Sequence, residues 1–289
     1  MTIGKVNRMR KVIFALVLLL NFLAIASAGN MQSNIEYGKA GDETLLLDVN
    51  VPDGNGPFAA AVIVHGGGWM RGDKQGNEGE KVLFGPLTDA GIVWFSINYR
   101  LAPKNHWPAC LDDVKTAIRW VKANAAKYKV DPNRVAIIGY SAGGQIACQA
   151  GVTADKDTAV AAIVGLAPPT DLVFDSLRRG GMSIYLKDLF GMQGVDVNTP
   201  KAVQPLWDAS PINHLKAGLP PILLVHGTAD KSVPYQLSLN FKARLDVVGV
   251  PCEIIAIKDA QHKIVDWNKY DGDFTKKITD WLTATLGKK

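Results

Sequence analysis

The chain of 289 residues has only three cysteines, Cys110, Cys148 and Cys252, and none of them has the spacing of a zinc site. Three cysteines allow at most one disulfide, which excludes a disulfide-based scaffold, and we expect buried free thiols. No Walker loop or dinucleotide-binding glycine motif follows a predicted strand, so we predict neither a cofactor nor a metal. Repeats and low-complexity tracts are absent too. With 47% hydrophobic residues, the chain can bury one large core.

The positive charge of the chain is concentrated at its N-terminus. Four basic side chains and no acidic one lie in the first 28 residues, namely Lys5, Arg8, Arg10 and Lys11. An almost wholly apolar run follows over 12–25, and Ala26-Ser27-Ala28 suits a signal peptidase. Because about 20 residues are needed to span a bilayer, we predict a cleaved signal peptide over 1–28. An uncleaved N-terminal anchor is the alternative.

Removal of that segment changes the charge of what remains. Subtracting its four positive charges from the net charge of +5 leaves +1 for residues 29–289. The high isoelectric point therefore gives no reason to expect a nucleic-acid partner. We predict export to the periplasm or the medium after cleavage near Ala28, with no stable membrane insertion of the mature chain.

Continuous apolar runs alternate with segments of helical periodicity through residues 29–289. Strands that are covered on both faces show such runs, whereas half-exposed strands alternate apolar and polar residues. The runs occupy residues 60–64, 92–97, 135–138, 160–164, 222–225 and 254–257. Residues 34–39 and 43–51 predict an antiparallel hairpin at one edge. The pattern predicts an α/β fold, with a doubly wound, mostly parallel eight-stranded sheet and helices on both faces.

Apolar residues at helical spacing predict three helices between and after these runs. The first includes Leu111, Val114, Ile118 and Val121, and Pro108 is well placed at its start. The second and third are marked by Leu237, Phe241, Leu245 and Val248, and by Phe274, Ile278, Trp281 and Leu282.

The pentapeptide Gly139-Tyr140-Ser141-Ala142-Gly143 fits the pattern G-x-S-x-G. It stands between a predicted strand and a helix that we expect to begin near Gly143 or Gly144. A sharp strand-to-helix turn holds a serine nucleophile in strained backbone geometry, and glycines there prevent collisions with neighbouring backbone. The N–H groups at the helix start can face a developing oxyanion. We predict Ser141 as a nucleophile and Ala142 as an oxyanion donor.

A second motif, His65-Gly66-Gly67-Gly68-Trp69, directly follows the run 60–64. Consecutive glycines let backbone N–H groups approach a substrate oxygen without interference from a Cβ atom. The pattern is typical of the oxyanion loop that follows the third strand in lipases and esterases. We predict Gly67 and Gly68 as donors, with Trp69 N–H as a replacement for either. Trp69 and Tyr140 are candidates for lining the substrate pocket.

An acid and a base follow the last two predicted strands. Asp230 lies just beyond the run 222–225, and His262 follows the run 254–257. Because parallel strands end at the same edge of a sheet, Ser141, Asp230 and His262 can converge there. His262 would take the proton of Ser141, and Asp230 would fix the tautomer of the base and stabilise its imidazolium.

The other four histidines are weaker candidates for catalysis. His65 and His226 both end strands, and we expect them to brace their own loops through hydrogen bonds. His106 and His214 lie in irregular segments, away from the ends of predicted strands.

Three acidic residues are expected to have structural roles. Asp259 is the alternative catalytic acid, but a carboxylate three residues before the base usually forms a turn. Asp112 and Asp113 have the position of first-turn charges in the predicted helix after Pro108.

The stretch 168–221 interrupts the alternation of strands and helices. It is rich in Gly, Asp and Pro, yet it contains an apolar set, Met182, Ile184, Tyr185, Leu189 and Phe190. It is either an ordinary surface excursion with one or two short helices or a small cap over the active site. Since few residues separate Gly29 from the first strand, we expect no N-terminal cap and a fairly open site.

Together these motifs resemble the hormone-sensitive-lipase-like branch of the α/β-hydrolases, in particular exported bacterial esterases of the acetyl-xylan and feruloyl esterase type. The resemblance covers nearly all of residues 29–289. Its landmarks are residues 48–52, 65–69, 98–103, 107–132, 139–144, 169–172, 209–212 and 226–234. It implies an α/β-hydrolase fold and assigns the same catalytic and oxyanion roles as above. One departure is the segment before and after the base, residues 259–263, which lacks the glycines common in such families and places Lys263 beside His262.

The resemblance implies a serine esterase without a cofactor that acts on a small-molecule or carbohydrate ester, with a short acyl, acetyl or feruloyl group. The absence of an N-terminal cap argues against a true lipase. One alternative is an arylformamidase-like amide hydrolase, which has a similar His-Gly-Gly-x-Trp loop. Another is a prolyl-oligopeptidase-type peptidase, although such enzymes normally carry a propeller domain. A non-catalytic binding module is the last alternative, and it usually lacks one of the three catalytic residues. No oligomeric state is predicted.

Overall fold

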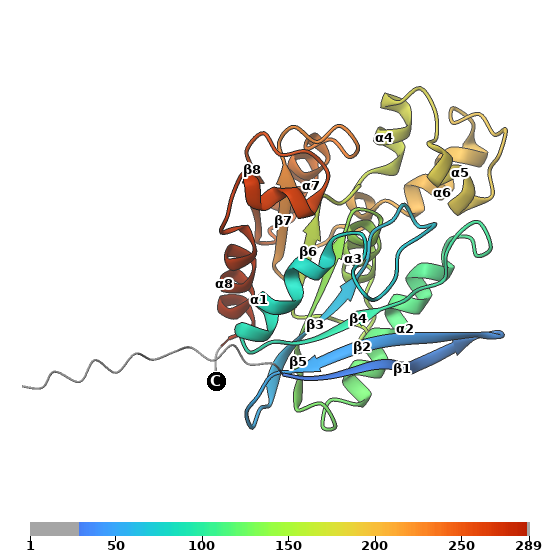
Figure 1. Ribbon diagram of the computed structural model, residues 1–289. Helices are drawn as coiled ribbons and strands as arrows, with labels where there is room; N and C mark the ends of the chain where they lie inside the picture. Colours follow the sequence, from blue (N-terminus) through green and yellow to red (C-terminus); the bar gives the residue numbers. More distant parts are fainter. Residues whose placement is uncertain (1–28, 288–289) are drawn as a thin grey trace, which may run out of the picture.

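The structure, a computed structural model, describes residues 29–287. The predicted signal peptide, residues 1–28, lies outside the described residues. An eight-stranded sheet runs through the protein in the order β1-β2-β4-β3-β5-β6-β7-β8 (Figure 1). Strands β1 (Asn30–Ala40) and β2 (Glu43–Val51) form an antiparallel hairpin, and β2 also pairs antiparallel with β4 (Val93–Ile97).

The remaining strands are parallel, and the chain adds them first on one side of β3 and then on the other. Besides β4, these strands are β3 (Phe58–Val64), β5 (Val130–Tyr140), β6 (Ala162–Leu166), β7 (Ile222–Gly227) and β8 (Cys252–Ile257). From β3 the chain first moves to β4 and then returns to add β5 on the other side of β3. The strand order therefore reverses at β3 and β5, and ligands of open α/β sheets bind outside the carboxyl ends of strands at such a point.

Helices cover both faces of this sheet (Figure 1). One face of the sheet is covered by three helices, which pack their apolar residues against it: α2 (Ala109–Ala123), α3 (Ala142–Val152) and α7 (Gln236–Val247). Helices α1 (Phe84–Asp89) and α8 (Phe274–Leu286) cover the other face. Along β3, Val62 and Val64 enter the first core, whereas Ala61 and Ile63 enter the second. The predicted fold class is therefore confirmed.

All eight predicted strands and the three predicted helices are present, but their ends are shifted, by four residues at the start of β1 and five at the start of β5. Strand β6 begins at Ala162, two residues after the apolar run begins, because Val160 packs into the core before the strand starts. Helix α2 begins directly after Pro108, as predicted. Helix α3 begins at Ala142, slightly earlier than expected. Helix α1 was not predicted, since six residues are too few to show a clear helical period.

The stretch 168–221 is more helical than predicted. Instead of one or two short helices, it holds α4 (Leu172–Arg178), α5 (Ile184–Phe190), α6 (Pro200–Asp208) and the 3₁₀ helix η2 (Pro211–His214). The side chains of Asp171 and Ser183 cap α4 and α5 by accepting hydrogen bonds from backbone N–H groups. Each helix is about two turns long, so the periodicity is weak and the caps are the clearer signal.

Two further predictions concern the cysteines and the membrane. Cys110, Cys148 and Cys252 are free and buried, as expected, and burial raises the pKa of the Cys110 and Cys252 thiols to about 12. Between residues 29 and 287, the structure contains no helix with the length and apolar character needed to cross a bilayer.

We predict that Phe241→Ala lowers the free energy of unfolding by about 3–5 kcal/mol, because a fully buried phenylalanine leaves a cavity. Leu239→Ala is the matched control, since Leu239 lies on the same helix, α7, and is exposed. The control should change stability by less than about 1 kcal/mol. Urea unfolding followed by circular dichroism measures both. Similar losses in the two variants would contradict the packing of α7 described above.

Candidate active site

Ser141 lies in a sharp turn between β5 and α3. Its backbone φ of 53° and ψ of −119° are strained for a residue with a side chain. Its N–H donates to the carbonyl oxygen of Leu166 at 2.8 Å, which ties the turn to the end of β6. The turn lifts the hydroxyl of Ser141 above the carboxyl end of the sheet, where the strand order reverses.

The turn is possible because two glycines allow the backbone to pass closely. A Cβ atom at Gly139 would lie 2.1 Å from the carbonyl oxygen of Gly143. A Cβ atom at Gly143 would lie 2.3 Å from the carbonyl oxygens of both Val64 and His65. The start of α3 therefore touches the end of β3 without any side chain between them.

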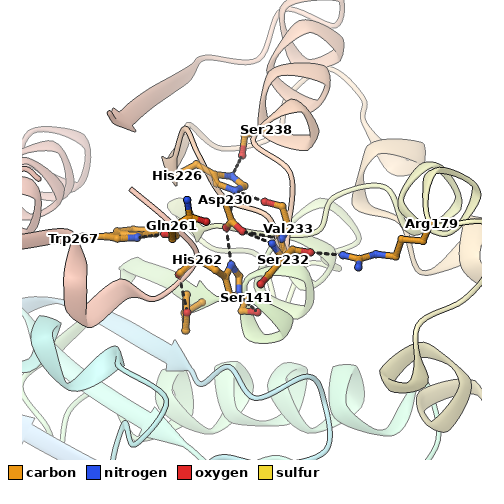
Figure 2. Close-up of polar contacts among 11 residues, drawn as sticks. Ser141, Arg179, His226, Asp230, Ser232, Val233, Ser238, Gln261, His262 and Trp267 are labelled. Atoms are coloured by element: carbon orange, nitrogen blue, oxygen red, sulfur yellow. Dashed lines mark hydrogen bonds and ion pairs between the residues drawn. The ribbon is translucent and has the colours of Figure 1, made fainter. Parts of the chain in front are cut away.

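The structure brings Ser141, His262 and Asp230 into one hydrogen-bonded chain (Figure 2). His262 Nδ1 lies 2.6 Å from Asp230 Oδ2, and His262 Nε2 lies 2.8 Å from Ser141 Oγ. Because a carboxylate only accepts, Nδ1 carries the proton and donates, and Nε2 accepts from the serine hydroxyl. The side chain of Asp230 is fully buried, whereas that of His262 is 22% exposed.

A second histidine extends this chain on the far side of Asp230. His226 Nε2 lies 2.9 Å from Val233 O and 3.3 Å from Asp230 Oδ2, so its proton points to both oxygens. His226 Nδ1 accepts from the hydroxyl of Ser238 at 2.8 Å. His226 thus braces its own loop, as predicted, and it also reaches the acid, which was not predicted.

The surroundings of Asp230 favour its charged form. Burial by itself raises the pKa of this carboxyl group, but hydrogen bonds from His226, His262 and the Val233 N–H outweigh it. The net result is a pKa well below the usual range. Asp230 therefore carries a negative charge at neutral pH and can stabilise a cationic ring at His262.

The glycine loop after β3 presents free backbone donors. Gly67 and Gly68 have φ angles of 109° and 64°, and Trp69 also has a positive φ of 60°. Among residues 29–287, no acceptor pairs with the N–H of Gly67 or Gly68. Ala142 is the first residue of α3, so its N–H has no partner within the helix. These N–H groups lie on segments that the contact at Gly143 holds together.

Trp69 and Tyr140 both lie inside the protein beside these donors. Trp69 is 6% exposed, and its indole N–H donates to Gln145 Oε1 at 2.9 Å. The Tyr140 hydroxyl donates to His262 O at 2.9 Å, and its ring stacks on the imidazole with centroids 5.3 Å apart. Both rings thus support the site through polar contacts. That they line a substrate pocket stays a prediction.

Buried ion pairs hold the loops around the site. Lys74, a few residues after the glycine loop, pairs with Asp48 of β2 at 3.0 Å, and both side chains are buried. Arg100 forms a bidentate pair with Asp113 at 2.8–3.0 Å. The expectation of a first-turn helix charge therefore holds for Asp112 and is wrong for Asp113. One helical step beyond Asp112 turns its side chain toward the interior, where Arg100 neutralises it.

His65 braces the glycine loop through a hydrogen bond, as predicted. Its Nδ1 lies 2.7 Å from Gly66 O, and its ring stacks on Tyr99 with centroids 4.2 Å apart. The Tyr99 hydroxyl donates to His65 O at 2.9 Å. Burial lowers the pKa of His65 to about 4, so its ring is neutral at physiological pH.

The helical stretch 168–221 contacts the site at two places. The ring of Tyr185, on α5, packs so closely on Gly68 that a Cβ atom there would lie 2.6 Å from it. Arg179, at the end of α4, donates to the carbonyl oxygen of Ser232 in the loop that carries Asp230 (Figure 2). The stretch therefore touches both the glycine loop and the loop of the acid.

The remaining candidates lie outside this chain of hydrogen bonds. His106 packs against Gly191, and His214 bonds to the carbonyl oxygen of Asp208. Asp259 has a positive φ of 58° in a turn after β8, which agrees with the expected role as a turn former. The residues that the structure describes contain no group of three or more His, Cys, Asp or Glu side chains arranged to hold a metal ion.

Comparisons with known proteins relate the chain to esterases. The sequence profile of the family BD-FAE matches residues 47–245. The probable carboxylic ester hydrolase LipM of Mycobacterium tuberculosis is 33% identical over 229 residues, which cover 75% of this chain and 52% of that protein. The chain thus spans about half the length of the curated relatives it matches.

Solved structures show the same architecture. A truncated form of a carbohydrate esterase from gut microbiota superposes with a TM-score of 0.76 and 27% identity, over 92% of this chain and 99% of the other. The acetyl ester-xyloside bifunctional hydrolase from Caldicellulosiruptor lactoaceticus gives a TM-score of 0.73 and 26% identity, over 90% and 98%. The fold is the α/β-hydrolase fold.

We predict that Gly143→Ala lowers the free energy of unfolding by about 2 kcal/mol or more, because two backbone carbonyls must move away from the new methyl group. Gly85→Ala in α1 is the control, since no atom lies within 4 Å of its added Cβ. The control should be neutral or stabilising by up to about 1 kcal/mol. Urea unfolding compares the two. An unchanged midpoint for Gly143→Ala would show that α3 and β3 are not in close contact.

Proposed function

Because the chain belongs to the BD-FAE family, we propose that it is a serine hydrolase of carboxylic esters. The hydrogen-bonded chain from Asp230 through His262 to Ser141 carries this proposal. The free N–H groups of Gly67 and Gly68 beside it support the same reaction.

In the proposed mechanism, His262 Nε2 takes the hydroxyl proton of Ser141 as Oγ attacks the ester carbonyl carbon. The carbonyl oxygen becomes an oxyanion, which the N–H groups of Gly67, Gly68 and Ala142 stabilise, with Trp69 as the alternative donor. The His262 imidazolium, held by Asp230, protonates the departing alcohol. A water molecule, deprotonated by His262, then attacks the acyl carbon, the bond from this carbon to Ser141 Oγ breaks, and His262 returns the proton to Oγ as the acid leaves.

For the substrate, we propose a small-molecule or carbohydrate ester with a short acyl, acetyl or feruloyl group. Two similar structures are those of a carbohydrate esterase and of an acetyl ester-xyloside bifunctional hydrolase, which supports this class. Within the catalytic domain, 29–289, we propose that residues 168–221 form a small cap. The contact of Tyr185 with Gly68 supports a cap at this place.

We predict that Ser141→Ala lowers kcat/KM for ester hydrolysis by about 10⁴-fold or more, since the nucleophile is lost while binding remains. Ser232→Ala is the control, because Ser232 contacts Asp230 and Arg179 only through backbone atoms. It should stay within about threefold of the wild type. The assay uses p-nitrophenyl acetate, butyrate and decanoate, acetylated xylan, methyl ferulate and N-formylkynurenine.

The panel also decides between the alternatives. Turnover of acetylated xylan or methyl ferulate that requires Ser141 would support a carbohydrate esterase. Turnover of N-formylkynurenine alone would keep the site and make the protein an amide hydrolase. If no substrate is turned over in a way that depends on Ser141, the catalytic proposal fails and the binding module becomes the better interpretation.

We also propose export after cleavage near Ala28. When the full chain is expressed in a bacterial host, mass spectrometry of the purified protein should find Gly29 at the N-terminus, because the residues before it suit a signal peptidase. Ala28→Leu should block cleavage and serves as the control. An intact N-terminus in the membrane fraction would instead indicate an uncleaved anchor.

A further inference from the structure

A buried glutamate is hydrogen-bonded to the glycine loop. Glu80 is the first residue of the 3₁₀ helix η1 (Glu80–Leu83) and is 1% exposed. Its Oε1 accepts a hydrogen bond from the N–H of Gly66 at 2.5 Å. Gly66 directly precedes Gly67 and Gly68, the two proposed oxyanion donors. The hydrogen bond to Glu80 therefore holds the peptide N–H just before these donors.

The other oxygen of Glu80 is costly to bury. Oε2 is buried and accepts no hydrogen bond from the residues described, 29–287. Burial, and to a smaller extent the negative charges of Glu78 and Asp73, raise the pKa of Glu80 to about 7. An apolar side chain of similar size would avoid this cost. Packing alone therefore gives no reason for a carboxyl group at this position.

The segment around Glu80 also contacts a second loop of the site. Gly79, just before it, packs on Ile264, two residues after His262, so closely that a Cβ atom would lie 2.3 Å from it. Gly66 packs on the ring of Tyr140, whose hydroxyl donates to His262 O. The glycine loop and the loop of the base thus contact the segment around Glu80, and Tyr140 contacts both of these loops.

We propose that Glu80 is a positioning residue, which sets the place of the oxyanion loop by accepting the N–H of Gly66. This inference rests on the proposed hydrolase function. Oxyanion donors act only at about 2.7–3.1 Å from the oxygen that becomes charged, so a small displacement of Gly66 weakens transition-state binding. Substrate binding in the ground state depends much less on the same donors.

Two substitutions separate the acceptor from the charge. Glu80→Gln keeps an oxygen at the same reach and removes the charge. Glu80→Asp keeps the charge and shortens the side chain by one methylene, which withdraws the acceptor from Gly66. A positioning role requires an acceptor oxygen at the distance that Glu80 provides. A purely electrostatic effect on Tyr140 or His262 requires the negative charge instead.

We predict that at pH 8.5 Glu80→Gln keeps kcat for p-nitrophenyl acetate within about threefold of the wild type. Glu80→Asp should lower kcat by about 10–100-fold, with KM within about threefold, because the transition state loses its aligned donors. The inhibition constant of phenylboronic acid, which forms a tetrahedral adduct with a serine, should rise for Glu80→Asp in step with the loss of kcat.

Circular dichroism and urea unfolding check that both variants fold. If Glu80→Asp does not fold, Glu80→Met takes its place, since it keeps the volume and removes the acceptor, and the same loss is expected. Equal kcat and equal boronate inhibition in the Gln and Asp variants would overturn the positioning role, as would a loss in Glu80→Gln alone. A wild type that hydrolyses no ester overturns the proposed function instead, so the two failures are distinguishable.

Discussion

The site depends on one close backbone contact, between the start of α3 and the end of β3. At Gly143 a Cβ atom would lie 2.3 Å from the carbonyl oxygens of Val64 and His65, so the two segments meet without a side chain between them. The contact exists because β3 and β5 are neighbouring parallel strands, so their carboxyl ends lie side by side, and the strand order reverses at the same place. The contact at Gly143 places the first N–H groups of α3 beside the glycine loop. The proposed nucleophile, Ser141, directly precedes these N–H groups.

This constraint explains why so much was predictable from the sequence. Strands covered on both faces have no polar alternation, so runs such as residues 60–64 stand out, and Val62 and Ile63 are indeed fully buried on opposite faces. The positions after those runs share one edge of the sheet by geometry. Ser141, Asp230 and His262 could therefore be placed near one another without knowledge of any contact between them.

The polar support of the site was not predictable in the same way. Asp113 differs from Asp112 only by its phase on α2, and its partner Arg100 lies in a preceding loop. Lys74 and Asp48 lie on a loop and an edge hairpin that periodicity does not bring together. Glu80 stands in a glycine-rich, charged segment that is typical of a solvated loop. In each case the sequence shows a charged residue, and only the fold determines that the residue is buried.

Buried polar groups occur both in the cores and beside the proposed site, and they differ in what their burial costs. The two cores on the faces of the sheet consist mainly of apolar side chains, but buried polar residues such as Ser96 of β4 and Thr279 of α8 lie among them. Among residues 29–287, five buried side-chain atoms lack a hydrogen-bond partner, and those other than Glu80 Oε2 belong to neutral groups, the hydroxyls of Ser96, Tyr128 and Ser176 and the amide oxygen of Gln149. A carboxyl group is the most costly of these to desolvate. Because folds tolerate such local costs chiefly where function requires them, the position of Glu80 next to the oxyanion loop is itself informative.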